Sequence, residues 1–384
     1  MSEWKKVKLD ELYEVHNGLS KGRQFFGTGF PFLTFSNVFN NWFLPKQLES
    51  LVQTTDKERE ACSIKAGDVF ITRTSETMDE LGMSSVALKD YPNATYNGFT
   101  KRLRPITNRV SPRYIGYYLR TPKFRGQFMA FSTMTTRASL ANNDLLNMEV
   151  ELPSMETQHR IATILSRYDS LIENYQKQIK LLGEAAQRLY KEWFIDLHFP
   201  GHENTNIIDG VPEGWEKKKV GDITPIITGK KDANFGTPDG EYPFFTCSQE
   251  PIKAPSFSFD CAAVLLAGNG DFNVKLYRGR FEAYQRTYVL SPYIDSHLYL
   301  LFYTISANMT KLAAGSSGST IKFLTKGMID GINLNVPNDE ILRSFNKKVE
   351  PIQSSRESLQ SQLRLLTEAR DRLLPKLMSG EITI

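Results

Sequence analysis

The chain has 384 residues, of which 40% are hydrophobic and 23% charged, so it has the composition of a globular protein rather than a disordered or fibrous one. At roughly 100 to 200 residues per domain, this length predicts two domains or halves, although a single large barrel also fits. The 47 lysines and arginines nearly balance the 43 acidic residues, and the net charge is +4. Any surface that binds an anionic partner must therefore be local.

Cysteine usage and hydropathy indicate the compartment. Cys62, Cys247 and Cys261 are scattered and odd in number, which favours a reducing, cytoplasmic setting over a disulfide framework or a CxxC zinc site. The first residues carry charge where a signal peptide needs an apolar core, and the longest apolar runs, 262–267 and 298–305, are too short to span a membrane. We expect neither secretion nor membrane insertion.

The chain repeats itself at an offset of about half its length. The offset is 211 residues at the start of each copy and 184 at the end, so the interior of the first copy is the longer one. Two versions of one module are therefore predicted. The matched pairs are Trp4 with Trp215, Asn17-Gly18 with Thr228-Gly229, 30–34 with 242–246, and 140–153 with 324–337.

Within each copy, the local patterns predict a mixed α/β (α+β) domain. Short apolar runs bounded by Gly, Pro, Asn and Asp predict strands at 69–71, 263–266 and 287–290. Helices are predicted at 114–119 and 298–305, after Ser-Pro and Asp-Ser caps.

A long helix is predicted after each copy. Apolar residues recur at alternating steps of three and four from Ile161 to Trp193 and from Phe345 to Leu377, over about four heptads. We expect Pro351 to shorten or kink the second helix near its start. Arg356 and Arg370 occupy positions in this seam, which suggests that part of each helix faces polar surroundings or another subunit.

A junction between the halves is predicted where residues that break secondary structure cluster. The predicted parts are a first mixed domain at 1–153, a first long helix at 154–197, a linker at 198–214, a second mixed domain at 215–337 and a second long helix at 338–384.

Motifs for catalysis are absent from the sequence. No GxxxxGK[ST] phosphate loop occurs, and the tetrapeptides of adenine methyltransferases are missing. Asp209, Glu216 and Lys218 could hold a magnesium ion, but they lie on a turn-rich segment, and we interpret them as solvated. His198 and His202 are separated by Pro200-Gly201, which breaks the helix that would align them on a metal. The chain is predicted to be non-catalytic and to hold no metal.

Local charge favours nucleic acid. No acidic residue occurs between Asp90 and Asp144, and a weaker acid-free window lies between Asp295 and Asp330. Such stretches can neutralise phosphates and release counterions, although an ordinary basic surface is the alternative. The basic residues of the first window are Lys101, Arg102, Arg104, Arg109, Arg113, Arg120, Lys123, Arg125 and Arg137.

Four loops are candidates to contact DNA. Segments 133–139 and 315–322 are small and polar, so their amides could approach a phosphate closely. Segments 72–75 and 268–271 each follow an apolar strand, where a loop can project; the alternative is a plain hairpin or strand-end loop. The predicted DNA-binding residues are Lys21, Arg23, Arg73, Thr74, Ser75, Lys101, Arg102, Arg137, Ser139, Lys230, Lys231, Asn269, Arg286, Ser316, Ser317, Ser319 and Lys322.

Four motifs within this duplicated architecture carry a resemblance to a known family. They are Val211-Pro212-Glu213-Gly214-Trp215-Glu216, the strand end and helix start at 151–161, the loop at 315–320 and the tail at 374–382. Together they resemble the specificity subunit of type I restriction-modification enzymes, and the resemblance covers essentially the whole chain.

The resemblance implies two target-recognition domains, each reading one half of a bipartite, asymmetric double-stranded DNA site. It also implies two antiparallel helices, related by a pseudo-twofold axis, that act as a spacer and dock two methyltransferase subunits. S-adenosylmethionine, ATP and magnesium would then belong to the methyltransferase subunits and to a separate motor and nuclease subunit. The alternative is a coiled-coil scaffold or adhesin-like protein with two binding heads.

The docking residues expected on this basis come from the helices. Tyr190, Trp193 and Phe194 are predicted to be exposed near the end of the first helix, where aromatic side chains could anchor a subunit. The second copy lacks the glutamine that Gln158 supplies in the first, so the two docking surfaces are expected to differ. The candidate docking residues are Gln158, Tyr190, Trp193, Phe194, Leu373 and Leu377.

Overall fold

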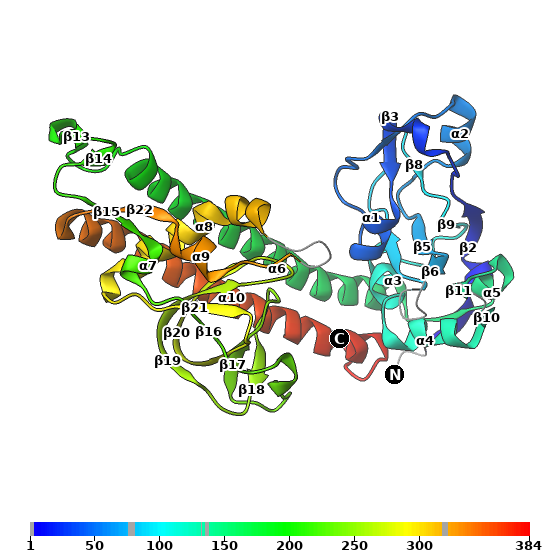
Figure 1. Ribbon diagram of the computed structural model, residues 1–384. Helices are drawn as coiled ribbons and strands as arrows, with labels where there is room; N and C mark the ends of the chain where they lie inside the picture. Colours follow the sequence, from blue (N-terminus) through cyan, green and yellow to red (C-terminus); the bar gives the residue numbers. More distant parts are fainter. Residues whose placement is uncertain (1–3, 76–80, 132, 135–137, 317–321) are drawn as a thin grey trace. The chain divides into compact units, whose positions relative to one another are not determined.

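The computed structural model describes residues 4–75, 81–131, 133–134, 138–316 and 322–384, and two compact units make up the chain (Figure 1). Unit 1 contains Met1–Asn174 and Gln362–Ile384, and unit 2 contains Tyr175–Ser361. The division falls inside the two long helices, whereas the segment 198–214 lies within unit 2. Arg137, Ser317 and Ser319, which we predicted to bind DNA, lie outside the described residues, as do the side chains of Thr74, Ser75 and Ser139.

Among the described residues, unit 1 contains four small sheets and five short α-helices. Its sheets, with strands in spatial order, are β1 (Lys5–Lys8) with β12 (Glu149–Leu152); β2 (Tyr13–Asn17), β9 (Thr100–Pro105), β5 (Val69–Thr72) and β7 (Ser84–Val86); β4 (Leu51–Val52), β3 (Phe26–Leu33) and β8 (Thr95–Tyr96); and β10 (Thr133–Met134), β11 (Ala138–Ser139) and β6 (Thr74–Ser75). Its short helices are α1 (Phe35–Asn40), α2 (Asp56–Ala61), α3 (Pro112–Tyr118), α4 (Pro122–Phe131) and α5 (Asn142–Leu146).

Unit 2 is organised around one larger sheet. Its sheets are β13 (Ile207–Ile208) with β14 (Val211–Pro212); β15 (Glu216–Lys219) with β22 (Asn333–Val336); and, in spatial order, β16 (Ile227–Thr228), β21 (Thr287–Leu290), β19 (Phe259–Ala267), β20 (Val274–Ala283), β17 (Tyr242–Phe245) and β18 (Ile252–Ala254). Its short helices are α7 (Val220–Ile223), α8 (Leu298–Gly315) and α9 (Lys326–Asp330). The strands predicted in both halves and the two short helices are confirmed.

The two long helices are α6 (Met155–Tyr190) and α10 (Asp339–Met378). A π-helical turn, Lys191–Ile195, follows α6. The expectation that Pro351 shortens the second helix is wrong, because α10 continues from Asp339 through Pro351 to Met378. None of the described helices has the length and apolar composition needed to cross a membrane.

Each unit contains opposite ends of the two long helices. In unit 1, Ile161 and Leu165 near the start of α6 share a hydrophobic core with Leu377 near the end of α10. In unit 2, Tyr190 at the end of α6 shares a core with Phe345 near the start of α10. Within each unit the helices are therefore antiparallel, and burial of their apolar faces stabilises both the helix pair and the domain packed on it.

The register of the small sheets confirms the internal repeat at both offsets. Lys8 pairs with Glu149 in unit 1, and Lys219 pairs with Asn333 in unit 2. One step farther along, the Leu9 N–H donates to Met148 O across 2.9 Å, and the Val220 N–H donates to Ile332 O across the same distance.

The central strands correspond as well, with one difference. In unit 1, β7 pairs with β5 and a separate strand, β8, pairs in parallel with β3. In unit 2, the long β20 does both, because it pairs with β19 and, in parallel, with β17. Most of the extra residues of the first copy lie between β3 and β8, in the segment that contains α1, β4 and α2.

Candidate nucleic-acid interface

Three segments that are distant in sequence meet at one edge of unit 1. They are the end of β5 with β6 (73–75), the turn between β8 and β9 (97–99) and β11 with the residue after it (138–140). The Arg73 N–H donates to Phe99 O across 3.0 Å, and Arg73 O accepts from the Leu140 N–H across 3.1 Å. Backbone pairing of Ser139 with Thr74 extends the contact. We call this group the loop edge of unit 1, and it brings together two of the four predicted loops.

Unit 2 has the same arrangement at the corresponding place. The Gly268 N–H donates to Arg286 O across 2.8 Å, and Gly268 O accepts from the Leu324 N–H across 2.8 Å. Asn269 forms an isolated antiparallel bridge with Phe323. The loop edge of unit 2 thus consists of 268–270, 284–286 and 323–324, and it joins the strand-end loop to the chain that follows the 315–322 loop.

Glycines at matched positions allow the middle turn of each edge to approach its neighbour. The Gly18 N–H bonds to Thr100 O, and a Cβ on Gly18 would collide with Asn97 O. The Gly229 N–H bonds to Thr287 O, and a Cβ there would collide with Ala283 O. This close backbone contact fixes the turn that carries Phe99 in unit 1 and Arg286 in unit 2.

Two cations lie close together at the loop edge of unit 1. Burial and the nearby Arg73 guanidinium lower the pKa of Lys101. Arg73 Nε is buried and has no hydrogen-bond partner among the described residues. A buried, unsatisfied donor next to a second cation is costly unless an anion approaches, so the Arg73 guanidinium is suited to a phosphate oxygen.

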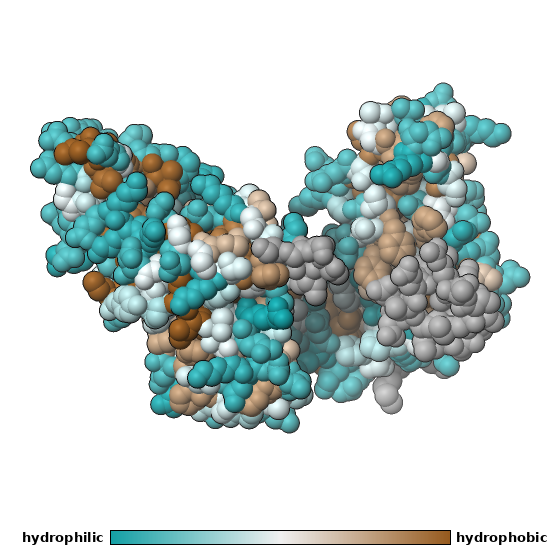
Figure 2. Space-filling view, viewed as in Figure 1, coloured by the Kyte–Doolittle hydropathy of each residue, from teal (hydrophilic) through white to brown (hydrophobic). Residues whose placement is uncertain are grey.

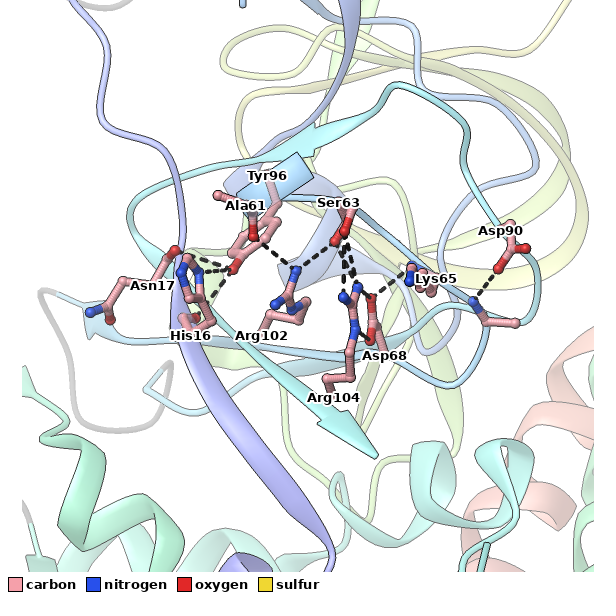
Figure 3. Close-up of polar contacts among 11 residues, drawn as sticks. His16, Asn17, Ala61, Ser63, Lys65, Asp68, Asp90, Tyr96, Arg102 and Arg104 are labelled. Carbon is pink, nitrogen blue, oxygen red and sulfur yellow. Dashed lines mark hydrogen bonds and ion pairs between the residues drawn. The ribbon is translucent and has the colours of Figure 1, made fainter. Parts of the chain in front are cut away.

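The prediction that Lys101 and Arg102 present their cations to DNA needs correction, because both side chains are buried. Lys101 Nζ is hydrogen bonded to Asn142 Oδ1. Arg102 Nη1 donates to Ser63 O across 2.8 Å and to Ala61 O across 3.3 Å. Figure 3 shows the Arg102 guanidinium directed at these carbonyls. Arg102 therefore stabilises the fold instead of forming part of the surface.

Arg104, on the same strand, has a similar internal role. Its Nε and Nη2 donate to the two carboxylate oxygens of Asp68 across 2.8 and 2.6 Å, and the Lys65 N–H donates to the same carboxylate (Figure 3). Asp68 is fully buried. The bidentate pair neutralises this buried acid, so Arg104 stabilises the fold and is not free to bind an anionic partner.

Of the other basic residues of this window, Arg120 and Arg125 are half-buried, whereas Arg109, Arg113 and Lys123 are exposed. Arg120 is half-buried, and its Nε donates to Ser84 O while its Nη2 donates to the carbonyls of Val38, Phe39 and Asn41. Burial, with a contribution from Arg125, lowers the pKa of Arg120 to about 10. A run of basic residues in sequence therefore does not become one continuous basic face, because carbonyls and an acid from other segments bind Arg102, Arg104 and Arg120.

Lys21 and Arg23 follow the matched glycine of unit 1. Lys21 Nζ forms an ion pair with Glu58 across 2.7 Å, and this pairing lowers the pKa of Glu58. Arg23 is exposed at the start of a short 3-10 helix, Arg23–Phe25.

In unit 2, several predicted residues lie on or beside the loop edge. Lys231 O accepts from the Gln285 N–H across 2.9 Å, and the Lys231 ammonium lies 4.3 Å from the centre of the Phe235 ring. Lys230 and Lys322 are exposed, as is Arg286. Ser316 is half-buried, and its hydroxyl donates to Ala313 O on the preceding turn of α8.

The expected exposure of the aromatic docking residues is wrong. Tyr190, Trp193 and Phe194 are each at most 5% exposed in the core of unit 2. The Phe194 ring lies 4.8 Å from that of Phe345 and 5.6 Å from that of Trp215. The second copy thus covers the end of the first helix with its own aromatic residues.

The remaining docking candidates are also largely internal. Gln158 is fully buried, and its side chain accepts from the Ser111 N–H and donates to Arg109 O and Pro153 O. Leu377 is buried and Leu373 half-buried in the core of unit 1.

The residues considered for metal binding form other contacts and do not gather into one site. Glu216 and Lys218 pair with each other across 2.6 Å. The His198 and His202 rings lie 5.2 Å apart, and His202 Nδ1 is within hydrogen-bond distance of Phe199 O. Within the part of the chain that the structure describes, no three His, Cys, Asp or Glu side chains are grouped as metal ligands.

Sequence reasoning missed Phe99, the residue whose carbonyl closes the loop edge of unit 1. Its ring is 54% exposed. The signal that could have found it is an aromatic residue directly after Asn97-Gly98, at a turn where polar residues are usual.

Comparison with known proteins gives concordant matches. A family model described as the type I restriction modification DNA specificity domain matches residues 1–182 and 212–355, one segment in each half. The specificity subunit of the type I restriction enzyme EcoDI from Escherichia coli is 36% identical over 45% of this chain, a match that spans 40% of that protein. The MjaIX specificity subunit from Methanocaldococcus jannaschii is 26% identical over the whole chain and 94% of its own length.

A solved structure shares the fold. The S subunit of a type I restriction-modification system from M. genitalium has a TM-score of 0.65 with this chain at 16% identity. The superposition covers 98% of this chain and 96% of that one.

Proposed function

This chain belongs to the type I restriction modification DNA specificity family, and on that premise we propose that each unit reads one half of a bipartite DNA site through its loop edge. The observation that supports this most strongly is the duplication of the edge: Arg73 and Gly268 make the same two backbone hydrogen bonds in their units. A duplicated frame with different side chains is what a protein needs to read two different half-sites.

The chemistry of each edge supports contact with DNA. The half-buried Arg73 supplies positive charge in unit 1, and the exposed Arg286 and Lys322 supply it in unit 2. Phosphate contacts fix the register of a protein on the duplex, whereas side chains at base edges provide sequence specificity.

We further propose that the long helices dock two methyltransferase subunits. The buried aromatic residues are not available for this contact, but exposed apolar side chains lie near them. Ile195, Ile207 and Ile208 are all more than half exposed on unit 2, and Figure 2 shows apolar surface over the β13–β14 hairpin. S-adenosylmethionine, ATP and magnesium are assigned to the methyltransferase and to the motor and nuclease subunit. The three free cysteines fit a cytoplasmic setting.

The test is to express the chain with its methyltransferase subunit and map methylated adenines across host DNA. The proposal predicts one bipartite motif with a fixed spacer. Methylation without a bipartite motif would contradict it.

A salt titration tests the phosphate contacts separately. The affinity of the complex for DNA should fall steeply with salt, and Arg73→Ala should reduce the slope of log K against log salt by about 1. Arg372→Ala is the matched control, because Arg372 is exposed on α10 and pairs with Glu368. A shallow slope for the unmodified complex would instead favour a scaffold that binds only proteins.

A further inference from the structure

The two loop edges share a backbone frame but differ in the side chains that they present. Leu140 and Leu324 donate to equivalent carbonyls, so the residues before them, Ser139 and Phe323, occupy equivalent places. The turns likewise place Phe99 in unit 1 where unit 2 has Arg286. An exposed phenylalanine therefore occurs once in each frame, on the turn segment in unit 1 and on the last segment in unit 2.

The backbone around Phe99 is held on both sides. Its N–H donates to Asn97 Oδ1 across 2.6 Å, and its carbonyl accepts from the Arg73 N–H across 3.0 Å. The next residue, Thr100, donates its N–H and its hydroxyl to Asn97 O. A phenyl ring that is 54% exposed on so constrained a turn leaves apolar surface in water, which is unfavourable unless a partner covers it.

The backbone around Phe323, in unit 2, is also held by contacts with a neighbouring segment. Phe323 is 39% exposed and pairs through its backbone with Asn269, directly before the Leu324 N–H that bonds to Gly268 O. Arg286, at the position equivalent to Phe99, is exposed and has its carbonyl fixed by the Gly268 N–H. Each loop edge thus carries an exposed ring on one of its segments and a cation on another, Arg73 in unit 1 and Arg286 in unit 2.

We propose that the Phe99 and Phe323 rings contact DNA bases through their apolar surface, and that their different places on the frame make the two units discriminate different positions of their half-sites. The proposal rests on the function proposed above. Apolar side chains in a groove either contact the thymine methyl group or insert between base steps, and both require a ring that projects from a fixed backbone.

Matched exposed residues serve as controls. Ile106 follows β9 at the end opposite to Phe99 and is 58% exposed; its N–H bonds to Leu12 O. In unit 2, Ile294 is 56% exposed after β21, at the end opposite to Arg286. Loss of either side chain removes a similar apolar area without altering a loop edge.

The experiment uses the complex of the full chain with its methyltransferase subunit. Phe99→Ala and Phe323→Ala should each weaken binding of the cognate site about tenfold and relax the methylation motif at one position, in opposite half-sites. Phe99→Leu should keep part of the affinity, whereas Ile106→Ala and Ile294→Ala should behave as the unmodified complex. Circular dichroism of every variant verifies that the fold is intact.

Modified DNA distinguishes the two forms of contact. If the Phe99 ring meets a thymine methyl, uracil in that half-site should weaken the unmodified complex and leave Phe99→Ala unaffected. If the ring inserts between bases, 2-aminopurine at that step should brighten with the unmodified complex and not with Phe99→Ala.

The outcomes separate the inference from the proposed function. If the unmodified complex methylates a bipartite motif while Phe99→Ala and Phe323→Ala match the isoleucine controls in affinity and motif, the inference is overturned and the proposed function stands. If the unmodified complex shows no sequence preference, the proposed function fails and the inference fails with it.

Discussion

Arg370 Nη1 on α10 donates to Asp169 Oδ1 on α6 across 2.9 Å, so an ion pair joins the two long helices within unit 1. The other carboxylate oxygen of Asp169 accepts from the Tyr117 hydroxyl across 2.5 Å, and the Arg370 guanidinium lies 5.5 Å from the centre of the Trp42 ring. The polar partners of Arg370 therefore lie within unit 1. The ion pair of Arg370 with Asp169 connects both helices to the domain packed against them.

The first prediction concerns the coupling of this pair. Arg370→Met and Asp169→Asn, alone and together, should give a coupling free energy of about 1 to 2 kcal/mol in urea unfolding, since both groups are only partly exposed. The exposed pair of Arg372 with Glu368 should couple by about 0.5 kcal/mol or less. Equal coupling of the two pairs would show that Arg370 is no better shielded than a surface arginine.

The second prediction concerns Trp193, which is 4% exposed in the core of unit 2. Trp193→Ala should lower the free energy of unfolding by about 3 to 5 kcal/mol, because it leaves a cavity against Phe345. Ile195→Ala, at an exposed position two residues on, should change it by about 0.5 kcal/mol or less. Urea unfolding followed by circular dichroism measures both, and a mild effect of Trp193→Ala would reinstate it as a surface residue.

The third prediction concerns Gln158. Gln158→Ala leaves the buried Ser111 N–H and the Arg109 and Pro153 carbonyls without this partner, which should cost about 1 to 3 kcal/mol of unfolding free energy. Gln187→Ala, at an exposed site on the same helix, is the control. A stable Gln158→Ala variant that no longer binds the methyltransferase subunit would show that Gln158 acts in docking after all.

The fourth prediction follows from His297, which is buried at the start of α8. Burial, and then the nearby Lys218, lower its pKa from 6.5, while Asp339 opposes the shift. As pH falls through 6.5, the unfolded chain takes up a proton that the folded chain resists, so the stability that is full above this pH is progressively lost below it. The urea midpoint of the unmodified chain should therefore fall more than that of His297→Gln on acidification from about pH 7.5 to about pH 5.5. If the urea midpoints of the unmodified chain and of His297→Gln fall equally on acidification, His297 is not the cause of the loss of stability.

The repeat could be read from sequence because matched residues must form matched contacts. Trp4 and Trp215 set the alignment of the first strands, and the pairs ending at Pro153 and Pro337 set that of the last. The two offsets differ, yet Lys8 with Glu149 and Lys219 with Asn333 occupy the same register. Strand pairing depends on this register, so the matched residues mark equivalent strands in the two copies.

The burial and the partners of the charged side chains could not be predicted from the sequence in the same way. Arg102 and Arg104 are two residues apart on β9, so they face the same side of the strand, and that side meets the carbonyl of Ser63 and the carboxylate of Asp68. Those partners come from a segment about 40 positions earlier, which a count of charges along the chain does not bring close. The aromatic end of α6 was misjudged for the same reason, because Phe345 covers Phe194 only after the second copy has folded.

The most direct test of the two-unit account is an exchange of one recognition domain. Residues 220–332, which lie between β15 and β22, would be replaced by the aligned segment of the MjaIX specificity subunit, and methylated adenines would be mapped for the chimera and the unmodified complex. The account predicts that one half of the bipartite motif changes while the other half is retained. A motif that stays the same in both halves, or changes in both, would contradict it.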